Sequence, residues 1–168
     1  MLATGYDTLA RRSEMVALRI DDIAAAADGS GTVTIRRSKT DQQGEGHVRY
    51  LAPDTMRHVS AWLAAAKLTD GPLFRAVTKG GCVGTGSLDG AAVADAFLAM
   101  ARDAGLSGVF SGHSTRVGAA QDAVAAGTLP AALQMGGWKS PEMLMRYSAR
   151  LDAARGGTAQ LAKAQRRG

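Results

Sequence analysis

The last third of the 168-residue chain carries, in order, His113, Arg116, Trp138 and Tyr147. Their types suit phosphodiester chemistry. A guanidinium such as that of Arg116 binds a phosphate through two parallel, charge-assisted hydrogen bonds. His113 lies three residues earlier and shares a face with Arg116 if the segment is helical, so both side chains can contact one phosphate. The Tyr147 phenol is a candidate nucleophile that would hold the phosphoryl group as a covalent ester.

Each of these residues also has an ordinary structural explanation. A histidine such as His113 can simply begin a helix, and a tryptophan usually means core packing. Tyr147 can pack its ring and hydrogen-bond its hydroxyl. The functional interpretation therefore depends on the ordered set and on partners further upstream.

Composition limits the class of protein. With 46% hydrophobic residues, the chain can bury one sizeable core, and its few aromatics favour helix over an all-β fold. The net charge of +5 indicates a polyanionic partner or a basic solubilising surface. One cysteine allows no internal disulfide. No apolar run approaches the ~20 residues of a membrane span, so we expect no membrane association.

The elements that must position the candidate groups can be predicted from periodicity and caps. A helix is expected over residues 7–19, capped by Asp7 or Thr8. Alternating β-branched segments predict an antiparallel sheet with strands at 32–37 and 47–51 and a short one at 22–26. Residues 79–90 are expected to form a flexible glycine-rich loop without a nucleotide site. Further helices are predicted to begin at Pro53 and Ser140 and to span 89–105, 112–127, 130–135 and 159–165.

Taken in order, these residues resemble the tyrosine recombinases, or phage integrase family, with a catalytic domain of Cre-like type. The segment from Ser111 to Arg116 is similar to the family's His-x-x-Arg box, and Trp138 and Tyr147 follow at suitable spacing. Upstream, Arg11 stands in the place of the first catalytic arginine, with Glu14 in the acidic place three residues later. Lys39 lies in the sheet region, where the family carries its catalytic lysine.

The resemblance implies a role for each of these residues. Arg11 and Arg116 would clamp the scissile phosphate and stabilise its developing charge. His113 would hydrogen-bond a phosphate oxygen and assist deprotonation of the phenol of Tyr147. Lys39 would protonate the leaving 5′ oxygen.

Two further residues would support this set. Trp138 would wall the site and offer one N–H donor, and Glu14 would buttress Arg11. The implied product is a 3′-phosphotyrosyl ester with a free 5′ hydroxyl, and a second 5′ hydroxyl can reverse the reaction on a new strand. No metal and no cofactor is expected.

The implied fold is α+β and mostly α, a helical catalytic domain with a small three-stranded antiparallel sheet of the DNA breaking-rejoining type. Residues 1–168 would form this domain alone. The family's separate N-terminal helical domain, which grips the other face of the DNA, is expected to be absent, either because the chain is a piece of a longer protein or because it is a short homologue. DNA affinity should then be weak and strongly salt-dependent, with poor sequence preference.

The expected partner is double-stranded DNA, and the expected location is cytoplasmic, at the nucleoid. Residues 152–168 follow the nucleophile and form either a helix that docks into a neighbouring subunit or a frayed tail. Leu161 suits a modest partner groove. We therefore expect a monomer alone and a homotetramer on DNA.

Two other functions compete with recombination. A type IB topoisomerase uses the same chemistry but reseals one duplex without exchange. A non-catalytic DNA-binding relic would need no placed nucleophile, which the retention of Tyr147 argues against.

Overall fold

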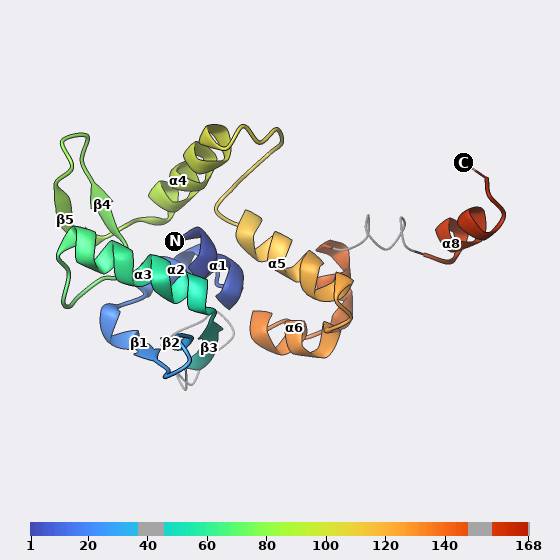
Figure 1. Cartoon of the computed structure of the whole chain (residues 1–168), viewed down its shortest axis with the longest axis horizontal. Coiled ribbons are helices and arrows are strands. Elements are labelled where there is room, and N and C mark those ends of the chain that lie inside the picture. The colour runs from blue at the N-terminus through green and yellow to red at the C-terminus, as the bar shows by residue number, and fades with distance from the viewer. Residues whose placement is uncertain (37–45, 148–155, 168) are drawn as a thin grey trace. The chain divides into compact units, whose positions relative to one another are not determined.

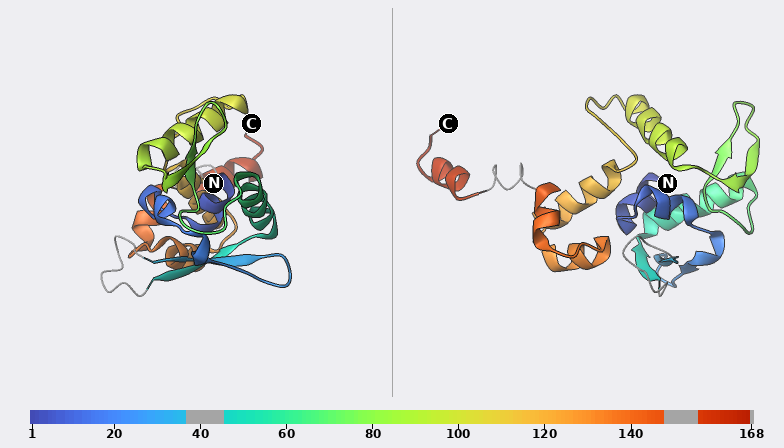
Figure 2. Two further views of the ribbon diagram at one scale, coloured as in Figure 1. Left: turned by 90° about the vertical axis from the view of Figure 1, so that its left-hand side faces the viewer. Right: turned by 180° about the vertical axis from the view of Figure 1, so that it is seen from behind.

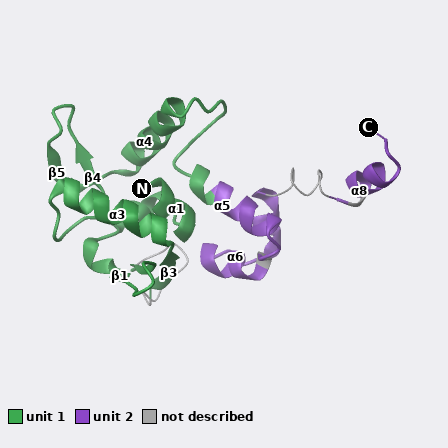
Figure 3. Ribbon diagram, in the orientation of Figure 1, with its two compact units in different colours: residues 1–116 green, residues 117–168 purple. Residues whose placement is uncertain are grey.

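The computed structural model describes residues 1–36, 46–147 and 156–167, and it divides into two compact units, 1–116 and 117–168 (Figure 3). The predicted class is confirmed, because the chain is mostly helical and carries one three-stranded antiparallel sheet. Figure 1 labels the elements.

The first unit begins with two short helices, α1 (Leu2–Thr8) and α2 (Arg12–Ala17). The prediction of one helix over 7–19, with a cap at Asp7 or Thr8, is wrong. Thr8 Oγ1 donates to Thr4 O at 2.6 Å and accepts from Ala10 N at 3.2 Å, so its hydroxyl helps to end α1. Leu9 follows with a left-handed φ of 50°. Such a conformation is costly for leucine, and the near-complete burial of Leu9 compensates for it.

The three-stranded sheet forms where the β-branched segments predict it. Its strands are β1 (Ile23–Ala25), β2 (Gly31–Ile35) and β3 (His47–Leu51), in that order and antiparallel. Val33 pairs with Ile23 on one side and with Arg49 on the other. Helix α1 contacts both β3 and α3 (Pro53–Ala66). Figure 2 shows the ribbon from two further directions.

Helices α3 and α4 (Gly90–Asp103) complete the core of this unit, and both begin where the sequence predicts. Pro53 occupies the first turn of α3, and the Asp89 carboxylate accepts from Ala92 N at 2.7 Å at the start of α4. Helix α4 is followed by Gly105 at φ 65°. The most deeply buried apolar side chains of the unit are Met15, Leu18, Val33, Leu51, Leu73 and Val93.

A β-hairpin stands where a flexible loop was expected. Strands β4 (Arg75–Val77) and β5 (Val83–Ser87) pair antiparallel, and Thr78 N donates to Cys82 O at 2.9 Å across the tip. The prediction for residues 79–90 is therefore wrong over 83–87. The alternating glycines of β5 have low intrinsic strand propensity, and the backbone pairing with β4 outweighs it.

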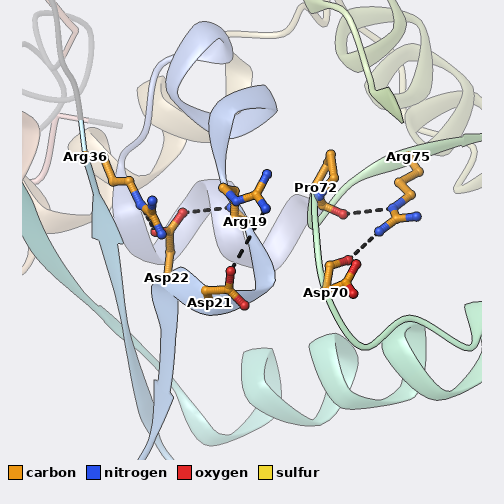
Figure 4. A network of polar contacts seen from close by, with 7 residues as sticks. All are labelled: Arg19, Asp21, Asp22, Arg36, Asp70, Pro72 and Arg75. Atoms are coloured by element: carbon orange, nitrogen blue, oxygen red, sulfur yellow. Dashed lines mark hydrogen bonds and ion pairs between the residues drawn. The ribbon is translucent and has the colours of Figure 1, made fainter. Parts of the chain in front are cut away.

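A buried carboxylate ties the sheet to the short 3₁₀ helix η1 (Ile20–Asp22) (Figure 4). The side chain of Asp22 is 2% exposed, accepts from Arg19 N at 2.8 Å and forms an ion pair with Arg36 Nε. Arg36 directly follows β2. Because a carboxylate buried without such partners would be costly, this network fixes the end of β2 against η1.

All regular secondary structure in the described part of the second unit is helical. The unit contains most of α5 (Ser114–Ala125), then α6 (Leu129–Gly136), a helix over 141–147 and α8 (Gly157–Ala164). These agree with the helices predicted there. Ala119, Ala120, Ala132 and Leu144 are buried. In the described part of the chain, every helix is too short or too polar to span a bilayer.

Candidate active site

Arg11 is the residue that precedes α2, and Glu14 holds it in place. Arg11 N donates to Glu14 Oε2, and Arg11 Nη1 donates to Glu14 Oε1, each at 2.7 Å. The Glu14 side chain is 6% exposed, whereas that of Arg11 is 26% exposed. The carboxylate therefore lies inside the protein and turns one edge of the guanidinium toward itself.

Arg116 lies in the first turn of α5 and is 3% exposed. Its Nη1 donates to the carbonyl oxygen of Leu9, the residue with left-handed backbone between α1 and α2. The break between α1 and α2 thus provides the carbonyl of Leu9 that binds Arg116. It also places Arg11 at the start of α2. Both arginines are positioned by the same local backbone.

His113 directly precedes α5 and is half-buried. Its backbone N donates to Ser111 Oγ at 3.2 Å, and Ser111 N donates to Ser114 Oγ at 2.8 Å. Burial lowers the pKa of His113, and the charges of Arg116, Arg11 and Arg12 lower it further. The histidine is outside the helix, yet it interacts electrostatically with Arg116.

A cavity of about 370 Å³ joins these segments. Its walls include Arg11, Arg12 and Ser13 from the start of α2, and His113 with its neighbours from the segment before α5. A cavity with arginine and a histidine of lowered pKa in its walls has the chemistry of an anion site with a proton acceptor.

Two glycines place Trp138 at the end of α6. Gly137 has φ 61° and donates its N–H to Gln134 O at 3.2 Å, and Trp138 N donates to Leu133 O at 3.0 Å. A Cβ at Gly136 would overlap the six-membered ring of Trp138. The Gly-Gly-Trp sequence is thus required locally, one glycine for the positive φ and the other for the ring.

Tyr147 ends the described part of the helix over 141–147. Its ring lies 5.9 Å from that of Trp138, centroid to centroid, with the planes tilted by 56°. Gln121 Nε2, from α5, donates to Tyr147 O at 2.7 Å. This tilted geometry is favourable for two aromatic rings, and the hydrogen bond fixes the backbone that carries the hydroxyl.

The predicted residues thus fall into three groups. Arg11, Glu14, His113 and Arg116 come together in the first unit, and Trp138 and Tyr147 come together in the second. Lys39 lies outside the described residues.

Three residues near these groups were not predicted. Arg12 lines the cavity, and Gln121 binds the Tyr147 backbone. Arg49 on β3 is half-buried, and burial lowers its pKa. The negative charge of Glu14 raises that pKa and so partly offsets the effect of burial. None of the three stands in a motif, so no local signal in the sequence identifies them. In the described ranges, no group of three or more His, Cys, Asp or Glu side chains could hold a metal ion.

Comparison with known proteins gives a consistent result. The phage integrase family matches residues 1–154. The chain is 32% identical over 175 residues to the recombinase Cre of Escherichia phage P1, which covers 95% of this chain and 51% of that protein. It is 30% identical over 162 residues to an integrase/recombinase XerD homologue of Selenomonas ruminantium, covering 88% and 45%. The chain therefore spans about half the length of these curated relatives.

Solved structures with the same fold include XerA recombinase, with a TM-score of 0.71 at 18% identity over 98% of this chain and 56% of that one. The XerH site-specific recombinase bound to its difH substrate has a TM-score of 0.66 at 18% identity, covering 92% and 44%. Because the sequence identity is only 18%, these likenesses show the fold alone.

Proposed function

Because the chain belongs to the phage integrase family of tyrosine recombinases, we propose that it is the catalytic domain of a site-specific DNA recombinase or integrase. The observation that supports this most directly is the buried Glu14 carboxylate holding Arg11 at a cavity shared with His113. A surface arginine needs no such buttress, whereas a guanidinium that must meet a phosphate in one orientation does.

In the proposed reaction, the Tyr147 phenol oxygen attacks the scissile phosphorus. A bond forms between that oxygen and phosphorus, and the bond from phosphorus to the 5′ oxygen breaks. The phenol proton passes to His113, whose lowered pKa keeps the imidazole neutral near pH 7 and able to accept it. Lys39 gives a proton to the leaving 5′ oxygen.

The negative charge that develops on the non-bridging oxygens is stabilised by Arg11 and Arg116. Trp138 packs beside the tyrosine ring and limits its movement. The product is a 3′-phosphotyrosyl ester with a free 5′ hydroxyl. Because the ester conserves the bond energy, a 5′ hydroxyl from another strand restores the phosphodiester, and the proposed reaction requires neither a metal nor a nucleotide cofactor.

The proposed partner is double-stranded DNA, which a basic chain of net charge +5 attracts electrostatically. XerH and the Tn1549 integrase, which share the fold, were solved with DNA bound. We place the activity in the cytoplasm, at the nucleoid. Leu161 on α8 is 51% exposed and offers an apolar contact for a neighbouring subunit, so we propose a monomer that forms a homotetramer on DNA.

An exchange assay tests this function against the alternatives. Two duplexes carrying the ends of the native element, one of them labelled, are incubated with the protein at low salt. A labelled hybrid duplex supports recombination. Relaxation of a supercoiled plasmid without exchange would favour a type IB topoisomerase. DNA binding without either product, even with an added N-terminal DNA-binding domain, would favour a binding relic.

A further inference from the structure

Arg12 lines the same cavity as Arg11 and His113, although it has no place in the predicted catalytic set. It is the first residue of α2 and directly follows Arg11. The ion pair of Glu14 is with Arg11 and not with Arg12.

Two glycines make room for the Arg12 side chain. A Cβ at Gly112 would lie 2.7 Å from Arg12 Cδ, and a Cβ at Gly90 would lie 3.2 Å from Arg12 Nε. Gly112 comes from the segment before α5, and Gly90 is the first residue of α4. The exposed Arg12 side chain thus runs beside backbone from two other segments, where a larger residue would displace it, and it lines the cavity wall.

Among the described residues, no carboxylate forms an ion pair with Arg12 at the cavity wall. Within residues 1–36, 46–147 and 156–167, the ion pairs are Arg11–Glu14, Arg19–Asp21 and Arg36–Asp22, and Arg12 forms none. Arg12, Arg11 and Arg116 all lower the pKa of His113, so all three cations act on the same histidine. A guanidinium stays charged at any physiological pH. The cavity therefore carries positive charge that an anion would neutralise.

We propose that Arg12 is a further phosphate-binding residue, which contacts a DNA backbone phosphate next to the one that Arg11 holds. This inference rests on the proposed function, because it takes the anion to be DNA. Glu14 holds Arg11, whereas the Arg12 side chain lies beside Gly90 and Gly112, so the two guanidinium groups reach the cavity from different positions and serve neighbouring phosphates more readily than one. The planar fork of a guanidinium is preorganised, so little entropy is lost for each hydrogen bond that it donates to such a phosphate.

The test measures the affinity of the whole chain for a duplex over a series of salt concentrations, by fluorescence anisotropy. Each phosphate contact contributes about 0.9 to the slope of log K against log [salt]. Arg12→Gln should reduce the magnitude of this slope by about 0.9, and Arg12→Lys should retain it. Arg57→Gln, which removes an exposed arginine of α3 outside the cavity wall, is the matched control and should leave the slope unchanged. Thermal melting confirms that each variant is folded.

An unchanged slope in Arg12→Gln would overturn the inference while leaving the proposed function intact. A wild-type chain that fails to bind duplex even at low salt would overturn both. The cleavage kinetics of nicked duplexes distinguish the role of Arg12 from that of Arg11. Arg12→Gln should raise the half-saturating DNA concentration more than it slows the saturated rate, and Arg11→Gln should do the reverse. Equal loss of the saturated rate in both variants would place Arg12 on the scissile phosphate and contradict our proposal.

Discussion

The carboxylate of Glu14 accepts two hydrogen bonds from Arg11, one from its backbone N–H and one from its guanidinium, each at 2.7 Å. One buried group thus both caps the start of α2 and orients the side chain at the cavity wall. This explains physically why an acidic residue stands three positions after the arginine. The orientation of Arg11 is built into the way its helix begins.

Glu14→Gln should therefore impair catalysis more than folding. The amide can still accept one hydrogen bond but no longer pairs with the charged guanidinium, at a cost of about 1–3 kcal/mol. We expect single-turnover cleavage of a nicked duplex to slow by roughly tenfold or more, because Arg11 loses its fixed orientation. Asp21→Asn is the control, since the exposed Asp21–Arg19 pair at 4.0 Å should contribute little. Equal cleavage rates for Glu14→Gln and wild type would refute the buttressing role.

His113 should titrate below the ordinary histidine pKa, because burial and three arginines disfavour its charged form. The unfolded chain then binds this proton at higher pH than the native chain. The stability contributed by neutral His113 is present above about pH 6.5 and is lost as the pH falls through the lowered native pKa. Proton NMR titration should give the lowered value, and Arg12→Gln should raise it. A pKa at or above the ordinary value would contradict the electrostatic account.

Gly136→Ala should displace Trp138, because the added methyl group occupies the space of the indole ring. Overpacking of this kind costs about 1–3 kcal/mol. We expect a lower melting temperature, a changed tryptophan emission spectrum and slower formation of any Tyr147 adduct. Gly118→Ala, at a helical glycine of α5 where nothing lies within 4 Å of the added carbon, separates the ring clash from the general effect of replacing a helical glycine. An emission spectrum like that of wild type in Gly136→Ala would show that the ring does not depend on this glycine.

Gln121→Ala should disturb the position of Tyr147, the proposed nucleophile, without removing it. The variant loses the hydrogen bond from Gln121 Nε2 to Tyr147 O and leaves that carbonyl with one partner fewer. Cleavage should slow several-fold, with stability reduced by about 1 kcal/mol. Gln134→Ala, at an exposed position of α6, is the matched control. If both variants cleave at the wild-type rate, Gln121 has no positioning role.

Much of the architecture could be predicted from local chemistry. Alternating β-branched residues mark β2 and β3, Pro53 marks the first turn of α3, and Asp89 marks the start of α4. In each case the determining interaction lies within a few residues of the chain.

The parts that could not be predicted depend on contacts between distant segments. The left-handed Leu9 is stabilised by burial and by Arg116, which is 107 residues away, so helical periodicity in the first segment could not reveal the break. Hairpin β4–β5 forms through backbone pairing despite its glycines. The contacts of Arg12 with Gly112 and of Gln121 with Tyr147 likewise join separate segments. The role of Lys39 stays a prediction, because this residue lies outside the described ranges.

The proposed reaction joins Tyr147 covalently to DNA. The direct measurement incubates the protein with nicked duplexes from the native element's ends, from which the cleaved flank diffuses away, and maps any denaturation-resistant adduct by mass spectrometry. We expect a phosphodeoxynucleotide on the peptide that contains Tyr147, and no adduct in Tyr147→Phe. An adduct that persists in Tyr147→Phe, or one that maps to another residue, would contradict the proposed reaction.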